Sequence, residues 1–128
     1  RAKGKARTIL GSDALDLTGI EPGTYTRWER EVVLTPHVVM FPAENVLAGA
    51  ASPLSVCVGN MMRFTGCTLA EAIDMASTLP ARKLGLTERG DIKAGKRADL
   101  ILFSLEEGNM CIQKTLVAGK VVYVREDG

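Results

Sequence analysis

The chemistry of this sequence centres on one carboxylate, Asp13, which follows a short apolar run. Residues 8–10 (Thr-Ile-Leu) predict a strand, and the small residues Gly11 and Ser12 separate that strand from Asp13. The end of a strand is a rigid place from which to present a catalytic acid or base. An aspartate after a strand is, however, more often a turn former or a helix cap. The residues around Asp13 by themselves therefore leave both interpretations open.

Histidine and cysteine, common ligands of transition metals, are too few and too scattered here to predict a metal site. His37 is the one histidine, and its place after Pro36 between two apolar runs predicts a turn residue. The odd number of cysteines, Cys57, Cys67 and Cys111, has no metal-ligand spacing and favours reduced thiols. A catalytic zinc or iron site needs about three protein ligands. We therefore predict no metal site in this chain.

The composition favours a globular protein of one domain's size. The chain has 128 residues, of which 46% are hydrophobic and 24% charged, and its net charge is +1. No strong field indicates nucleic acid or membrane as a partner, and no run of 18 apolar residues or signal peptide is present. We expect a cytoplasmic location. The basic start, RAKGKAR, predicts a solvated helix end and connector, as if the chain continued an earlier segment.

The first half of the chain predicts short strands that precede a helical region. The predicted strands are residues 24–26, 31–34 and 38–41. The last two flank Thr35-Pro36-His37 and predict a hairpin, because β-branched residues cluster on both sides. Residues 46–51 (VLAGAA) are small and predict a loop.

Two helices follow this loop. Ser52 and Pro53 are typical of a helix start, and apolar residues then recur on one helical face at Leu54, Cys57, Val58, Met61 and Met62. Gly66 predicts a left-handed end to that helix. Thr68 to Glu71 form a capping box for the next helix, and residues 80–84 predict a further helical turn that Gly85 ends.

The last third of the chain predicts β-structure. Residues 88–99 contain two glycines and predict tight turns, with Asp99 ordering the turn before the next strand. Residues 100–103 form an unbroken apolar run, which predicts a strand buried on both faces. Residues 110–117 and 121–124 predict a hairpin. The order of elements indicates a mixed α and β protein.

Several of these stretches occur together and in order in one enzyme family. They are the Asp13-Ala14 pair after the first strand, the LAGA run from Leu47 to Ala50, TGCTLAEAIDMASTLPARKL, GDIKAGKRADLIL and VAGKVV. In this combination the chain resembles the C-terminal part of N-acetylglucosamine-6-phosphate deacetylases, a family of the amidohydrolase superfamily. Two positions depart from the family pattern: Ser12 stands where threonine is usual, and Ala50 where serine is usual.

The resemblance implies an α/β fold that is a C-terminal fragment of a TIM-barrel metal-dependent hydrolase, with the last barrel strand and helices plus part of a small β-sandwich. Residues 1–87 would be the barrel piece with an inserted hairpin, and residues 88–128 the sandwich part. A divalent metal, zinc or iron, is implied for the full-length enzyme, with its ligands upstream and none in this chain. We expect a homo-oligomer.

The resemblance also implies a reaction and site residues. The substrate would be N-acetylglucosamine 6-phosphate, whose acetamide is hydrolysed to acetate and a free amine. Asp13 would be the general base, which takes a proton during water attack and returns it to the departing nitrogen. Leu47, Ala48 and Gly49 would line the substrate through backbone groups, although a plain loop leading into the helix explains these residues equally well. The isolated chain is expected to be inactive.

Two alternatives remain open on the sequence. One is a different amidohydrolase-superfamily enzyme, such as a deaminase or a dihydropyrimidinase-like enzyme, because the GDIKAGKRADL segment occurs throughout that superfamily. Such enzymes should lack the LAGA run at this spacing from Asp13. The other is a non-enzymatic domain that pairs with a partner through an exposed strand at residues 8–10.

Overall fold

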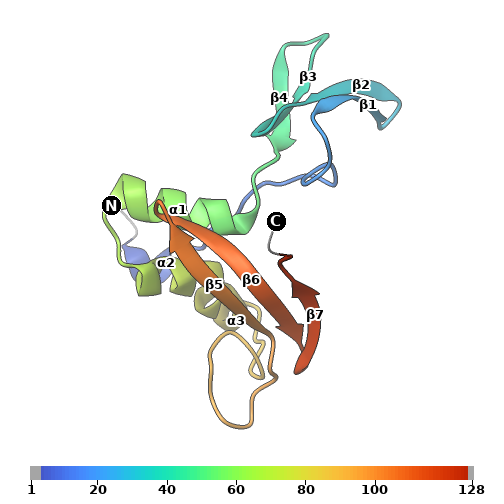
Figure 1. Cartoon of the computed structure of the whole chain (residues 1–128). Coiled ribbons are helices and arrows are strands. Elements are labelled where there is room, and N and C mark those ends of the chain that lie inside the picture. The colour runs from blue at the N-terminus through green and yellow to red at the C-terminus, as the bar shows by residue number, and fades with distance from the viewer. Residues whose placement is uncertain (1–3, 127–128) are drawn as a thin grey trace. The chain divides into compact units, whose positions relative to one another are not determined.

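The computed structural model describes residues 4–126 of the chain. Contacts divide the chain into two compact units. We call Gly11–Cys57 the strand unit, and the described residues of Arg1–Leu10 and Val58–Gly128 the mixed unit. Each of the two β-sheets lies in one unit (Figure 1). The mixed α and β class predicted from the sequence is confirmed, whereas the predicted boundary between residues 87 and 88 stays a prediction.

The strand unit is built on a four-stranded antiparallel sheet. Its strands, in the order in which they pair, are β1 (Gly23–Arg27), β2 (Arg30–Leu34), β3 (Val38–Phe41) and β4 (Val46–Ala50). The core of this unit consists of Leu17, Val32, Leu34, Val39 and Ala51. The β-branched residues thus fill one face of the sheet, and Leu17 from the preceding loop packs with them.

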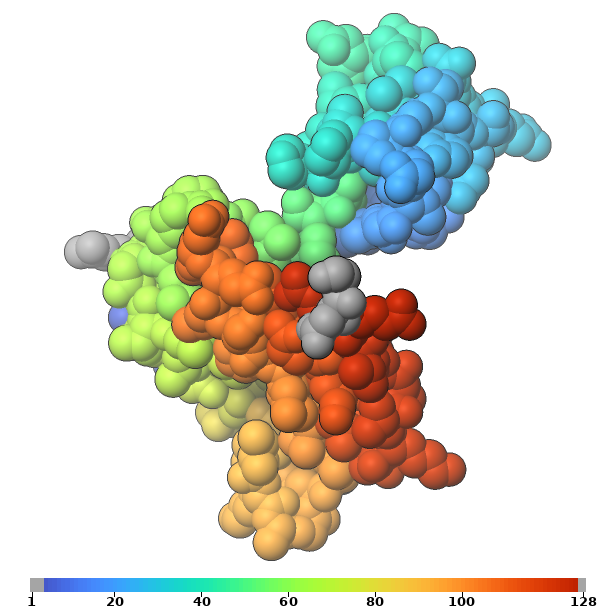
Figure 2. Space-filling view, viewed as in Figure 1, coloured from blue at the N-terminus to red at the C-terminus, as the bar shows by residue number. Residues whose placement is uncertain are grey.

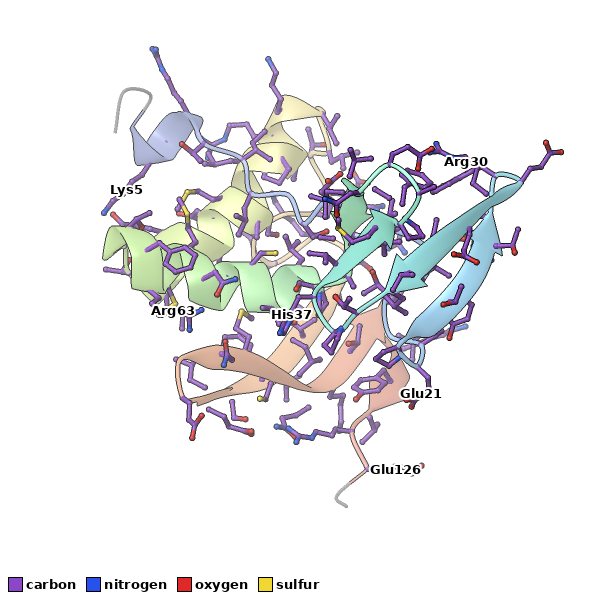
Figure 3. All side chains as sticks on the ribbon, turned by 90° about the horizontal axis from the view of Figure 1, so that it is seen from above. Lys5, Glu21, Arg30, His37, Arg63 and Glu126 are labelled. Carbon is purple, nitrogen blue, oxygen red and sulfur yellow. The ribbon has the colours of Figure 1, made fainter. Side chains whose placement is uncertain are left out.

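The predicted hairpin between β2 and β3 is confirmed. The hydroxyl of Thr35 accepts the N–H of Val38 at 3.1 Å, and the N–H of Thr35 donates to the Val38 carbonyl at 2.9 Å. His37 is exposed in this connection, as a turn histidine should be. Arg30 and His37 lie at opposite ends of β2 (Figure 3).

Two local predictions were wrong for one reason, which is that strand pairing is a long-range property. The predicted loop at residues 46–51 forms strand β4, because β3 supplies a partner for a run of small residues. The predicted strand at residues 8–10 is not a strand; the N–H of Leu10 donates to the Met75 carbonyl at 2.9 Å, and Thr8 bonds back to the residues of η1 and Gly4. Pairing begins later, where Ala14 forms an isolated parallel bridge with Ala50. The hypothesis of a partner that pairs with an exposed strand at residues 8–10 therefore loses its structural basis.

Short helices form one layer of the mixed unit. They are η1 (Lys5–Arg7), α2 (Leu69–Ala76), α3 (Thr78–Lys83) and the greater part of α1 (Leu54–Thr65), whose first residues belong to the strand unit. Gly66 ends α1 at a φ of 67°, and its N–H donates to the Met62 carbonyl at 2.9 Å. The predicted capping box of Thr68 and Glu71 is present at the start of α2. Lys5 adds an ion pair to the Glu71 carboxylate at 2.7 Å.

A three-stranded antiparallel sheet forms the other layer of the mixed unit. Its order is β5 (Leu100–Glu106), β6 (Asn109–Val117) and β7 (Lys120–Val124), which confirms the predicted hairpin. The core between the layers consists of Val58, Cys67, Ala72, Met75 and Met110. The carboxylate of Asp99 accepts the N–H of Ala118 at 2.8 Å, which ties the residue before β5 to the turn between β6 and β7.

The prediction that residues 100–103 are buried on both faces was wrong. Ile101 is 47% exposed and Leu102 is 52% exposed, whereas Phe103 packs on the core. The reason is that β5 is an edge strand, and helices cover the sheet on one face. The exposed surface of β5 to β7 is orange to red in Figure 2.

Candidate functional site

Asp13 lies in the strand unit and is fastened to the edge of β4 by its main chain. Its carbonyl oxygen accepts the N–H of Ala50 at 2.8 Å, and the N–H of Leu15 donates to the Ala50 carbonyl at 3.0 Å. Asp13 adopts a left-handed φ of 55°, which aspartate tolerates better than most residues. Its side chain is exposed. The fold therefore holds the backbone of Asp13 in place while leaving its carboxylate accessible.

A second acid nearby, Asp16, has a different environment. The Nε of Arg27 donates to the Asp16 carboxylate at 2.9 Å, which ties the loop after Asp13 to strand β1. Among the residues that the structure describes, no hydrogen bond or ion pair engages the Asp13 carboxylate. Among the described residues, the Asp13 carboxylate is thus without a partner, whereas the Asp16 carboxylate is paired with Arg27.

The three residues predicted to line a substrate, Leu47, Ala48 and Gly49, lie on β4. Leu47 is 58% exposed, Ala48 is half-buried and Gly49 is buried. Met40 pairs with Leu47 and Val39 with Gly49, so Ala48 has no partner on β3 and forms a β-bulge. Bulges are frequent next to active sites, where they redirect the chain.

The structure brings Gly49 next to Asp13. A Cβ built on Gly49 would lie 3.1 Å from the carbonyl oxygen of Asp13. The predicted catalytic residue and one of the predicted substrate residues, Gly49, therefore lie side by side, although their roles stay predictions. Sequence reasoning missed the role of the Ala50 backbone, whose N–H bonds to the Asp13 carbonyl and whose carbonyl accepts the N–H of Leu15. No local pattern marks that role, because backbone pairing between residues 13–15 and 50 is independent of side-chain type.

Comparison with known proteins assigns the family. The model of the amidohydrolase family matches residues 6–122. The chain belongs to the amidohydrolase family. It is 38% identical over 118 residues to a putative N-acetylgalactosamine-6-phosphate deacetylase of Escherichia coli K12. That match covers 91% of this chain and 68% of the relative. It is also 28% identical over 120 residues to the mouse N-acetylglucosamine-6-phosphate deacetylase, which covers 93% of this chain and 29% of the mouse protein.

A solved structure agrees with this assignment. The N-acetylglucosamine-6-phosphate deacetylase of Thermotoga maritima matches with a TM-score of 0.80 at 31% identity, over 94% of this chain and 32% of that chain. This chain therefore spans about a third of that structure and 29% of the mouse relative. The resemblance to the amidohydrolases seen in the sequence is confirmed.

Amidohydrolases are generally metal-dependent, so the positions of the possible metal ligands show whether the described residues hold a complete metal site. Within residues 4–126, no group of three or more histidine, cysteine, aspartate or glutamate side chains is placed to hold a metal ion. Asp13 could supply one ligand at most, and a catalytic site needs about three. The described residues therefore do not fit a complete metal centre.

Cys111 is poorly suited to act as a nucleophile in this amidohydrolase chain. A hydrogen bond to the Glu106 carboxylate raises the pKa of the Cys111 thiol, and the same bond lowers the pKa of Glu106. Because the thiolate is the reactive form, a raised pKa reduces its population at neutral pH. All three cysteines are free thiols.

Arg89, Lys96 and Arg97, in the segment before β5, have acidic partners. Lys96 pairs with Asp91 at 2.5 Å and Arg97 with Asp99 at 3.0 Å. These ion pairs make this segment a charged turn surface. In the same described part of the chain, none of the helices is both long and apolar enough to cross a membrane.

Proposed function

We propose that this chain is the C-terminal part of a metal-dependent hydrolase that removes acetate from N-acetylglucosamine 6-phosphate. Residues 8–15 would complete a TIM barrel, and residues 88–128 would form part of a β-sandwich. The single observation that carries the proposal is the exposed, unpaired carboxylate of Asp13 beside the bulged, small-residue strand β4. The names of the mouse and Thermotoga maritima relatives support the substrate.

Asp13 would transfer the proton that amide hydrolysis requires. Water attacks the acetamide carbon, and Asp13 accepts the proton that the water loses as the new C–O bond forms. Asp13 then donates this proton to the nitrogen as the C–N bond breaks, because an amide anion is a very poor leaving group. The products are acetate and the free amine of the sugar phosphate. A positioned acid–base group of this kind contributes on the order of 10²–10⁴ in rate.

Strand β4 would position the substrate with its backbone. The bulge leaves Ala48 without a residue opposite it on β3, and the main chain of Ala48 would contact the substrate there. The small side chain of Ala48 allows a ligand to approach the main chain closely. Leu47, which is exposed, would contact the apolar face of the sugar or its acetyl group.

The metal ion, zinc or iron, would be bound by residues outside the described part of this chain. This follows from the donor set, because Asp13 offers a single ligand. When bound, such an ion would supply Lewis-acid activation of the hydrolytic water. The 128-residue chain by itself should therefore be inactive. We place the complete enzyme in the cytoplasm, as a homo-oligomer without nucleic-acid or membrane partners.

A second substrate is N-acetylgalactosamine 6-phosphate, the C4 epimer. The observation that favours it is the 38% identity to the Escherichia coli K12 relative, whose name carries that sugar. The reaction and the role of Asp13 would be the same for both epimers. Measuring kcat/KM for the two sugar phosphates in one assay decides between them, because the true substrate should have the larger value.

The decisive test of Asp13 is substitution in the full-length enzyme. Asp13→Asn keeps the size of the side chain but cannot accept the proton, so kcat should fall by about 10²–10⁴ with little change in KM. Asp16→Asn is the matched control, because it removes an acid that is ion-paired to Arg27. Equal losses in the two variants, or an Asp13→Asn enzyme that retains about a tenth of kcat or more, would contradict the proposed role.

A further inference from the structure

We propose that Gly49 is a positioning residue for Asp13: its missing side chain lets β4 bond to the backbone of Asp13 and fix where the carboxylate lies. This inference rests on the proposed function of Asp13. It assigns Gly49 a role that differs from lining a substrate, since it depends on the absent Cβ and not on the amide groups of Gly49. The experiments below separate this inference from the proposal about Asp13.

The space next to Gly49 is fully occupied. A Cβ at this position would lie 2.7 Å from Cγ and 3.0 Å from Cδ1 of Leu15, and 3.1 Å from the carbonyl oxygen of Asp13. Gly49 is buried, and it is not among the glycines with a positive φ. Gly49 is thus required for close approach and not for an unusual backbone conformation, because a residue with a Cβ needs the Leu15 side chain to move and the Asp13 carbonyl to give way by a few tenths of an ångström.

A side chain at position 49 would disturb the backbone hydrogen bonds that hold Asp13 and Leu15 against β4. Ala50, the next residue, accepts from the N–H of Leu15 and donates to the carbonyl of Asp13. On its other side Ala50 pairs with Val38 in β3, so the attachment leads into the core of the strand unit. The left-handed φ of Asp13 is sparsely populated by residues with a side chain, so it needs this support.

The geometry explains why a small displacement would matter. The Leu15 side chain can change rotamer to make room for a methyl group, but the Asp13 carbonyl belongs to the main chain and can only move with it. A misplacement of about 1 Å can cost on the order of 10² in rate, so a shift of a few tenths of an ångström at the Asp13 carbonyl should cost less than that. Gly49 would therefore act on the reaction through Asp13, without contact with the reacting atoms.

The first test measures amide hydrogen exchange in this chain, without any need for activity. Gly49→Ala should accelerate exchange at the Ala50 and Leu15 amides by about tenfold or more, because both bonds lose their geometry. Gly23→Ala is the matched control in β1, where the nearest atom to a new Cβ is the Tyr25 ring at 3.7 Å, an ordinary contact. Unchanged exchange in Gly49→Ala, or equal acceleration in Gly23→Ala, would overturn the inference.

A double variant keeps the test valid if Gly49→Ala does not fold. Leu15→Ala combined with Gly49→Ala removes the contacts at 2.7 and 3.0 Å and leaves the one to the Asp13 carbonyl. Exchange at Ala50 should then lie between wild type and Gly49→Ala, with β2 and β3 amides still protected. A double variant that also fails to fold, or that loses protection throughout the sheet, would show that Gly49 serves folding in general and would overturn its positioning role.

Kinetics in the full-length enzyme complete the test. Gly49→Ala should lower kcat by several-fold to about tenfold with KM nearly unchanged, and adding Leu15→Ala should restore part of that loss. A rise in KM at constant kcat would instead assign Gly49 to substrate binding and overturn the positioning role. If Asp13→Asn is fully active while exchange at Ala50 responds as expected, the proposed function fails and the structural placement by Gly49 stands.

Discussion

The two sheets of this protein contain similar residues and bury them to opposite extents. In β2, the sequence REVVL places Val32 and Leu34 in a core closed by Leu17. In β7, the sequence KVVYV is exposed along its whole length, and Val122 is 60% exposed. The difference lies in the neighbours, because β2 has strands on both sides and a covering loop, whereas β7 is an edge strand.

This comparison shows why the candidate site lies where it does. The strand unit has its own core, and its edge strand β4 is occupied by the backbone of residues 13–15. That rigid arrangement can hold a catalytic carboxylate in one geometry. The sheet of the mixed unit depends on the helices for its core and offers no comparable support at β7.

The largest effect in this comparison should come from one substitution made in both sheets. Val39→Ala removes two methyl groups from a fully buried side chain, and it should lower the free energy of unfolding by roughly 1.5–3 kcal/mol. Val122→Ala, at an exposed site, should change it by less than about 0.5 kcal/mol. Urea unfolding measures both. Equal destabilisation would mean that β7 is covered in solution and would contradict the difference in burial between the two sheets.

A smaller effect should follow when the helical layer of the mixed unit is weakened. Thr68→Ala removes the hydroxyl that accepts the Glu71 N–H at 3.3 Å in the capping box, and it should destabilise the protein by about 1 kcal/mol. Exchange should accelerate in α2 and in the strands that pack on it. Thr68→Ser retains the cap and is the control. A loss confined to the strand unit would contradict the division into two units.

The smallest effect should be a pH dependence at the same helix. The pKa of Glu71 is lowered by its hydrogen bond to Lys5, and further by the backbone of Thr68. A carboxyl whose pKa is depressed in the folded state stabilises the protein above its unfolded pKa, and this stabilisation is lost as the pH falls through the folded pKa. Wild type should therefore be more stable than Glu71→Gln at pH 7, and the difference should shrink below about pH 4. A difference that grows in acid would contradict this account.

Much of the local structure could be predicted because its causes are local. The capping box of Thr68 and Glu71 and the left-handed end at Gly66 depend on residues within four positions of each other. Asp13 and the LAGA run were identified from residue types and from a family resemblance. Their proximity could not be derived from local pattern, because it depends on a bridge between Ala14 and Ala50.

The sequence by itself determined the start and end of the first helix, the capping box of the second and the hairpins β2–β3 and β6–β7, because those features follow from residue identity at short spacing, and the resemblance of stretches along the chain gave the family and the acid to be tested. Only the tertiary structure decided that β4 is a strand, that Asp16 is bound to Arg27 while Asp13 is not, and that Gly49 lies against the Asp13 carbonyl. Each of these depends on contacts between residues far apart in the chain. Such contacts are set by packing and backbone pairing, for which the local sequence carries no signal.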